Sequence, residues 1–208
     1  MEHRRNDGHE TIHGADTNGA LTMSAGTRWS VRGIVRTTLP VLVALTALEL
    51  ASGLVLGTIQ ATLLEYPSLL VLVPVTIGTA GNLGSVLAAR LSTAFHLGTL
   101  RFGRGDTLLG NALATVALAV TVFPVVGAGA WGLTAATGEA GLSLPTVVFV
   151  ALASGLVLAA LAIGITVVAT YGAYRLGLDP DNVVIPVVTN VCDVLGVLVL
   201  FAVVRVLV

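Results

Sequence analysis

Charge is scarce in this sequence, and lysine is absent altogether. All 10 basic residues are arginines, and charged residues make up only 10% of the 208-residue chain. Hydrophobic residues make up 55%, and the mean hydropathy is +0.96. Because soluble domains carry about 25% charged residues, this composition excludes an ordinary soluble domain and indicates an integral membrane protein. The net charge of −1 predicts no nucleic-acid partner.

Cysteine is nearly absent too. Cys192 is the only one, which excludes an intrachain disulfide and a cysteine-based metal cluster. It stands beside Asp193 and either faces the same pathway or fills space in the core, and we favour the filler role. The histidines at 3, 9 and 13 are irregularly spaced in a polar segment, so we interpret them as solvated rather than metal-binding. We expect residues 1–37 to be a largely disordered cytoplasmic tail and 38–208 to form a five-helix transmembrane domain.

Long apolar runs dominate the rest of the chain. A spanning helix needs about 20 mainly apolar residues, and five segments qualify: 39–64, 68–95, 108–133, 144–174 and 183–208. The runs are continuous rather than alternating, which favours helices over a β-barrel. No internal repeat is evident, so any symmetry has to come from a second subunit. We therefore predict an all-α, polytopic protein embedded in a lipid bilayer.

Arginine is distributed unevenly between the ends of these spans. Arginines precede the first span, surround the second connection and occur in the fourth, whereas the first and third connections have none. These arginines are Arg4, Arg5, Arg28, Arg32, Arg36, Arg90, Arg101, Arg104 and Arg175. The positive-inside rule then predicts a cytoplasmic N-terminus and a C-terminus outside the cell membrane. Arg205 is the exception, and its long side chain can reach the outer interface.

Asp193 is an ionisable residue inside the last apolar run. A charged group at the bilayer centre costs roughly 2.5–3.5 kcal/mol on insertion scales, so a span that keeps one is expected to use it. On a helix, Pro186, Asn190 and Asp193 share a face, with Gly196 one turn further on. This spacing predicts a functional site at Asp193, with Asn190 beside it.

A second group of small and polar residues lies in the second predicted span. Pro74 is followed by Gly78, Gly81 and Gly84, and Asn82 shares a helical stripe with Gly78. Proline and glycine let a helix kink or approach another chain, and carbonyls freed there act as oxygen ligands. Two interpretations stay open: tight helix packing through small residues, or a polar pore wall to which Asn82 contributes.

The other acids near the spans also have alternative roles. Glu49, midway along the first span, is either a second ion or coupling site or a protonated carboxyl bonded between helices. Glu65 at the outer turn either attracts cations or is an ordinary solvated acid. The Asp-Pro-Asp sequence at 179–181 is typical of a helix N-cap with an acid in the first turn. Capping is therefore favoured for Asp179 and Asp181, and a cation site at the cytoplasmic mouth with Asp106 is the alternative.

Two separated motifs carry a resemblance to a known family. The stretch PVTIGTAGNLGS at 74–85, then GLDP at 177–180, Pro186, Thr189 and DVLG at 193–196, resembles the membrane domain of the MgtE family of magnesium channels and transporters. The resemblance covers about 39–208, with five spans in the family's order. The sequence ARLST at 89–93 with HLG at 96–98 is similar to the archaeal and animal solute-carrier branch.

The resemblance implies a homodimer whose second and fifth spans line a central pore. The fifth-span aspartates of both subunits would hold a hydrated Mg²⁺, which places Asp193 in that role and Asn82 with the 78–81 backbone on the second-span motif. Val86 stands where many bacterial members have a glutamine. The family's large cytoplasmic regulatory domain has no counterpart in this sequence, so we expect no gating by that route within this polypeptide.

The ligand chemistry agrees with Mg²⁺ as the transported ion. Mg²⁺ takes oxygen ligands and keeps several waters, and Asp193, Asn190 and Asn82 offer such oxygens, whereas a softer metal would need cysteine or histidine clusters. We predict movement of Mg²⁺ or a similar divalent cation, not enzymatic activity. A cation-coupled Mg²⁺ exchanger and a non-conducting partner of a homologous channel subunit are the alternatives. An enzyme using Glu49 and Asp193 as an acid/base pair would need further motifs that are not evident.

Overall fold

The structure, a computed structural model, describes residues 31–58, 60–100 and 106–208. All regular secondary structure in these ranges is helical, which confirms the all-α prediction. The helices are α2 (Val31–Thr58), α3 (Gln60–Glu65), α4 (Pro67–His96), α5 (Asp106–Ala136), α6 (Leu144–Leu176) and α7 (Pro180–Leu207). Five helical segments in the described ranges are long and apolar enough to cross a membrane: Thr38–Thr58 of α2 and the whole of α4, α5, α6 and α7.

The chain divides into two units, Met1–Arg36 and Thr37–Val208. Of the first unit the structure describes only the start of α2, so the predicted tail and its histidines lie outside the described residues. The second unit holds the rest of α2 and all the helices that follow it.

The first predicted span corresponds to two described helices, α2 up to Thr58 and α3 from Gln60, and residue 59 between them lies outside the described residues. α4, in contrast, stays α-helical from Pro67 to His96 with Pro74 inside it. The glycines of α4 therefore act through close approach to a neighbour and not through a break in the helix.

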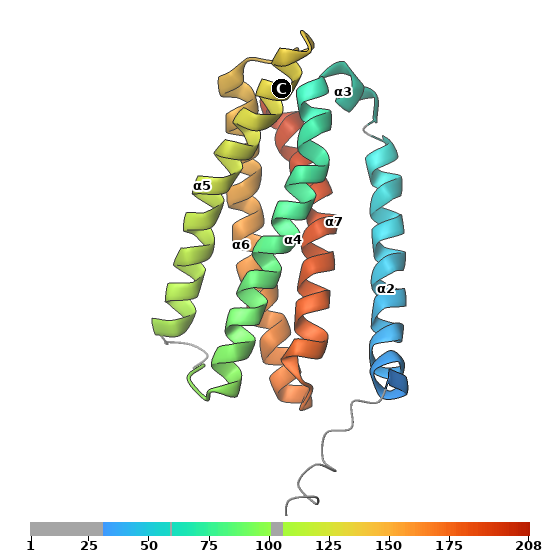
Figure 1. Ribbon diagram of the computed structural model, residues 1–208, viewed down its shortest axis with the longest axis vertical. Helices are drawn as coiled ribbons and strands as arrows, with labels where there is room; N and C mark the ends of the chain where they lie inside the picture. The colour runs from blue at the N-terminus through green and yellow to red at the C-terminus, as the bar shows by residue number, and fades with distance from the viewer. Residues whose placement is uncertain (1–30, 59, 101–105) are drawn as a thin grey trace, which may run out of the picture. The chain divides into compact units, whose positions relative to one another are not determined.

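Four helices, α4 to α7, pack side by side in the second unit (Figure 1). Their buried side chains form two apolar clusters, one centred on Phe123 and Leu158 and one on Leu69 and Val150. Polar bonds join α4 to α5 near both ends of the pair: Ser68 Oγ lies 2.6 Å from Thr134 Oγ1, and Arg90 Nε donates to Asn111 Oδ1. In lipid, such packing and interhelical hydrogen bonds take the place of the hydrophobic driving force.

The start of α7 follows from its sequence. Asp179 is the N-cap and accepts a hydrogen bond of 3.1 Å from the backbone N–H of Asp181, with Pro180 in the first turn. The preceding helix α6 ends at Gly177 in the left-handed conformation, with φ 64°, which glycine adopts without a Cβ penalty. The predicted capping role of Asp179 is thus confirmed.

Helix α2 stands apart from the other four within the second unit (Figure 1). Its backbone makes no close contact with any other described helix. Among its described side chains only Leu45 and Ser52 are buried. The gap between α2 and the bundle contains the cavity described below.

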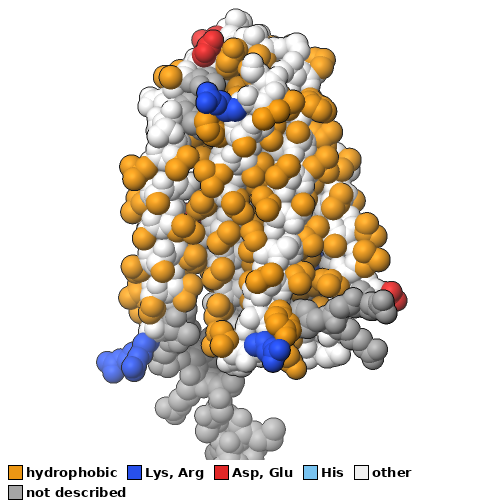
Figure 2. Space-filling view, turned by 180° about the vertical axis from the view of Figure 1, so that it is seen from behind, with side chains coloured by type: hydrophobic (Ala, Val, Ile, Leu, Met, Phe, Trp, Pro, Cys, Tyr) orange, Lys and Arg blue, Asp and Glu red, His pale blue; other side chains and the backbone are white. Residues whose placement is uncertain are grey.

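The surface of the protein has an apolar middle and charged ends. Hydrophobic side chains cover the middle of the face in Figure 2, and charged side chains lie near its two ends. Large exposed side chains such as Leu109, Leu113 and Val125 are 61–70% exposed. An apolar band between charged ends is typical of helices that face lipid.

Candidate functional site

The interface between α4 and α7 is built on glycines. A Cβ at Gly84 would lie 2.8 Å from Cys192 Sγ, and one at Gly196 would lie 3.2 Å from Ile77 Cα. A Cβ at Gly81 would lie 3.0 Å from Asp193 Cγ and 3.3 Å from Asp193 Oδ2. α4 and α7 thus approach closely at Gly81 and Gly84, which brings Asp193 against α4, and the role of these glycines in a pore wall stays a prediction.

Asp193 lies at this close approach with an unsatisfied oxygen. Its Oδ1 is buried and has no hydrogen-bond partner among the described residues. No arginine or histidine forms an ion pair with it in the described part of the chain. A buried carboxylate oxygen without a partner is costly, so its surroundings are suited to a positively charged ligand.

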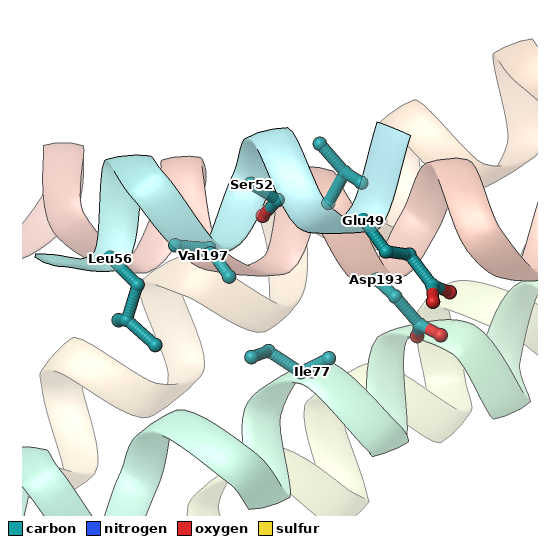
Figure 3. Close-up of a pocket in the computed structure, with 8 residues that line it drawn as sticks. Glu49, Ser52, Leu56, Ile77, Asp193 and Val197 are labelled. Carbon is teal, nitrogen blue, oxygen red and sulfur yellow. The ribbon is translucent and has the colours of Figure 1, made fainter. Parts of the chain in front are cut away.

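A cavity of about 350 Å³ opens next to Asp193. α2 contributes one face at helical spacing and α4 and α7 contribute the other: Glu49, Ser52, Gly53, Leu56, Ile77, Asp193, Val194 and Val197. In Figure 3 the carboxylates of Glu49 and Asp193 lie close together at one end of this lining. The structure thus brings together two acids that the sequence placed in separate spans.

The predicted second-span ligands lie elsewhere on α4. Gly78 and Asn82 are exposed and do not line the cavity, and Val86 on the same stripe is 48% exposed. Asn190 is half-buried on α7 and donates from Nδ2 to Pro186 O at 2.8 Å. Within one chain, Asn82 and Gly78 therefore do not join the Asp193 cavity.

A second group of candidate ligands lies where α4 ends and α7 begins. Ligand atoms of His96, Asp179 and Asp181 all lie within 4.8 Å of one another. His96 Nε2 is 3.7 Å from Asp179 Oδ1, and Ser92 Oγ donates to Asp181 Oδ1 at 2.6 Å. The prediction grouped Asp106 with these acids and missed His96, which no spacing in the sequence connects to them; Asp106 is not in the group.

The acid predicted at the other end of the bundle has a basic neighbour. Glu65 and Arg205 both line a cavity of about 420 Å³ formed with Tyr66, Val204 and Val208. The Arg205 guanidinium lies over the Phe201 ring, 5.5 Å from its centroid. A cation attracted to Glu65 would also meet the positive charge of Arg205, and the predicted role of Glu65 stays a prediction.

Cys192 is buried, with 2% of its surface exposed. It packs against Gly84 of α4, on the side of α7 that faces the apolar cluster around Phe123. The favoured interpretation of Cys192 as a small core residue agrees with this burial.

Comparison with known proteins adds to this geometry. A family model for MgtE, described as a divalent cation transporter, matches residues 73–203. Solute carrier family 41 member 3 of Rattus norvegicus is 31% identical over 153 residues, which is 70% of this chain and 33% of the rat protein. The Mus musculus protein of the same name is 31% identical over 136 residues, 63% of this chain and 28% of the mouse protein. The chain thus spans about a third of the length of these relatives, and no solved structure matches it.

Proposed function

Since the chain belongs to the MgtE family of divalent cation transporters, we propose that it carries Mg²⁺ across a membrane along the face where α4 meets α7. Asp193 is the ligand that attracts the ion. The observation that carries this proposal is its buried, unpartnered Oδ1, held against Gly81 within the family's matched region.

The ion fits the donor set. Mg²⁺ prefers oxygen ligands and gives up its water reluctantly, so proteins bind it through one or two carboxylates while it keeps several waters. The Asp193 carboxylate and the side-chain oxygen of Asn190 lie on one helix face, three residues apart. A pathway bordered by these oxygens passes the ion without a soft ligand.

A second copy of the chain would complete the pathway. The stripe of Gly78, Asn82, Val86 and Ala89 on α4 is exposed in one chain, and an amide facing lipid is unfavourable. Pairing two such stripes across a twofold axis buries Asn82 and places two α4 helices and two α7 helices around one path.

The arginine distribution supports a cytoplasmic N-terminus.

Purified protein in liposomes tests this function. The chain alone is reconstituted with a Mg²⁺-sensitive dye inside, and Mg²⁺ is added outside with and without a Na⁺ or proton gradient. We expect Mg²⁺ influx above that of protein-free liposomes in the absence of either gradient. Flux no greater than in protein-free liposomes under every condition would overturn the proposal, and flux only with a gradient would replace it with coupled exchange.

A further inference from the structure

Two like-charged side chains converge in the cavity between α2 and the bundle. Glu49 comes from α2 and Asp193 from α7, and their carboxylates approach each other at one end of the lining (Figure 3). No arginine, lysine or histidine lines this cavity. Two carboxylates that share a site disfavour each other's charged form unless a positive ligand lies between them.

The rest of the lining also provides a hydroxyl group, from Ser52. Ser52 is one helical turn from Glu49 on the same face of α2 and is 8% exposed. Its side chain lines the cavity together with Glu49 and Asp193. A buried serine and the two acidic side chains thus line the same space.

The size of the cavity suits an ion that keeps part of its water. One water needs only about 10–15 Å³ of such space, so about 350 Å³ accommodates a small cation with several waters. Mg²⁺ commonly binds in this manner, through one or two carboxylates and retained waters.

We propose that Glu49, Ser52 and Asp193 form a divalent-cation site inside each subunit, in which the ion joins α2 to α7. For the identity of the ion this inference rests on the proposed function. The site differs from a site on a dimer axis, because its two acids come from different helices of the same chain.

The site also accounts for the position of α2. This helix has little packing of its own, since Leu45 and Ser52 are its only buried side chains among those described. Apolar contact alone therefore holds it weakly. A cation bound by Glu49 and Asp193 supplies the missing attraction and couples occupancy of the site to the docking of α2.

The test measures Mg²⁺-dependent stabilisation of the detergent-purified chain beside flux in liposomes. Thermal unfolding is followed against Mg²⁺ concentration for wild type, Glu49→Gln, Asp193→Asn and the double variant, with Glu139→Gln as the control. Glu139 is an exposed acid between α5 and α6. A ligand that binds only the folded state raises the unfolding temperature by an amount that grows with the logarithm of its concentration relative to its Kd.

We expect each single variant to raise the Mg²⁺ concentration needed for a given increase in unfolding temperature by about 10-fold or more, and the control to match wild type. Because both acids hold one ion, the double variant should lose little beyond the larger single loss. The shared site would be overturned if Glu49→Gln titrates with Mg²⁺ like wild type, or if the losses of Mg²⁺ affinity in the two single variants multiply in the double variant. Absence of any stabilisation of wild type by Mg²⁺ would also overturn it.

A further pair of variants covers the case in which Glu49→Gln gives no monodisperse protein. Glu49→Asp keeps the charge but withdraws it by one methylene, and Ser52→Ala removes the hydroxyl. Both are expected to weaken the titration, and wild-type values for both would overturn the site. Flux separates this outcome from failure of the proposed function: a wild-type chain without Mg²⁺ flux contradicts the function, whatever Glu49 does.

Discussion

Asp193 on α7 lies directly against Gly81 on α4, so that a Cβ at Gly81 would lie 3.0 Å from the carboxyl carbon of Asp193. Glycine at this position leaves room for the carboxylate, which has no hydrogen-bond partner for its Oδ1 in the described residues. The position of the acid therefore depends on a residue with no side chain.

Gly81→Ala tests this dependence. The added methyl group must displace the Asp193 side chain, so we expect Mg²⁺ flux to fall by about 10-fold or more, as for other misplaced ligands, while the chain still folds. Gly110→Ala on α5 is the control, because a Cβ there meets nothing within 4 Å. Equal flux from the two variants in liposomes would show that the position of Asp193 is not critical.

Gly84→Ala should lower the stability of the fold and should not displace Asp193. Its methyl group would lie 2.8 Å from Cys192 Sγ and 2.9 Å from Val188 Cγ1, both in the core. Overpacking of this kind costs about 1–3 kcal/mol, which should lower the unfolding temperature in detergent. Gly164→Ala on α6 has open space at its Cβ and should unfold at or above the wild-type temperature, and a Gly84→Ala protein as stable as this control would contradict the close approach.

The cap of α7 can be separated from charge at the same residue. Asp179→Ala removes the acceptor for the Asp181 N–H and should destabilise the protein by about 1 kcal/mol. Asp179→Asn should remain close to wild type, because asparagine caps about as well as aspartate. Unfolding temperatures of the two variants decide the matter: equal losses would assign the effect to the negative charge beside His96 and not to the cap.

Asn82 provides a test of the outer face of α4. Asn82→Leu replaces an amide by an apolar group of similar length on a stripe that is exposed in one chain, so the single chain should stay folded. We expect this variant to lose more Mg²⁺ flux than Val86→Ala on the same stripe, because only Asn82 offers an oxygen ligand. Equal losses in liposomes would favour packing between two chains over a role in the ion path.

The sequence predicted the helices better than it predicted which side chains of different helices lie next to each other. Long apolar runs located all five helices in the described residues that are long and apolar enough to cross a membrane. Asp193 stood out because an acid in an apolar run is unfavourable. Its contact with Gly81 depends on how α4 and α7 rotate against each other, which one-dimensional spacing cannot give.

The relative rotation of the helices also explains why some candidate ligands could be grouped only in the structure. Ser52 joined the candidate site only when α2 was seen to direct one face at Asp193, and His96 joined Asp179 only where the ends of α4 and α7 meet. Asn82 and Gly78, selected for their stripe on one helix, instead lie on the exposed face.

The most direct measurement of the central claim compares Mg²⁺ influx for Asp193→Asn and Glu139→Gln in liposomes that contain equal amounts of protein. Asparagine keeps the size of the side chain and removes its charge, and each variant removes one acid. The account predicts that Asp193→Asn loses most of the Mg²⁺ influx while Glu139→Gln transports like wild type. Wild-type influx through Asp193→Asn would contradict it.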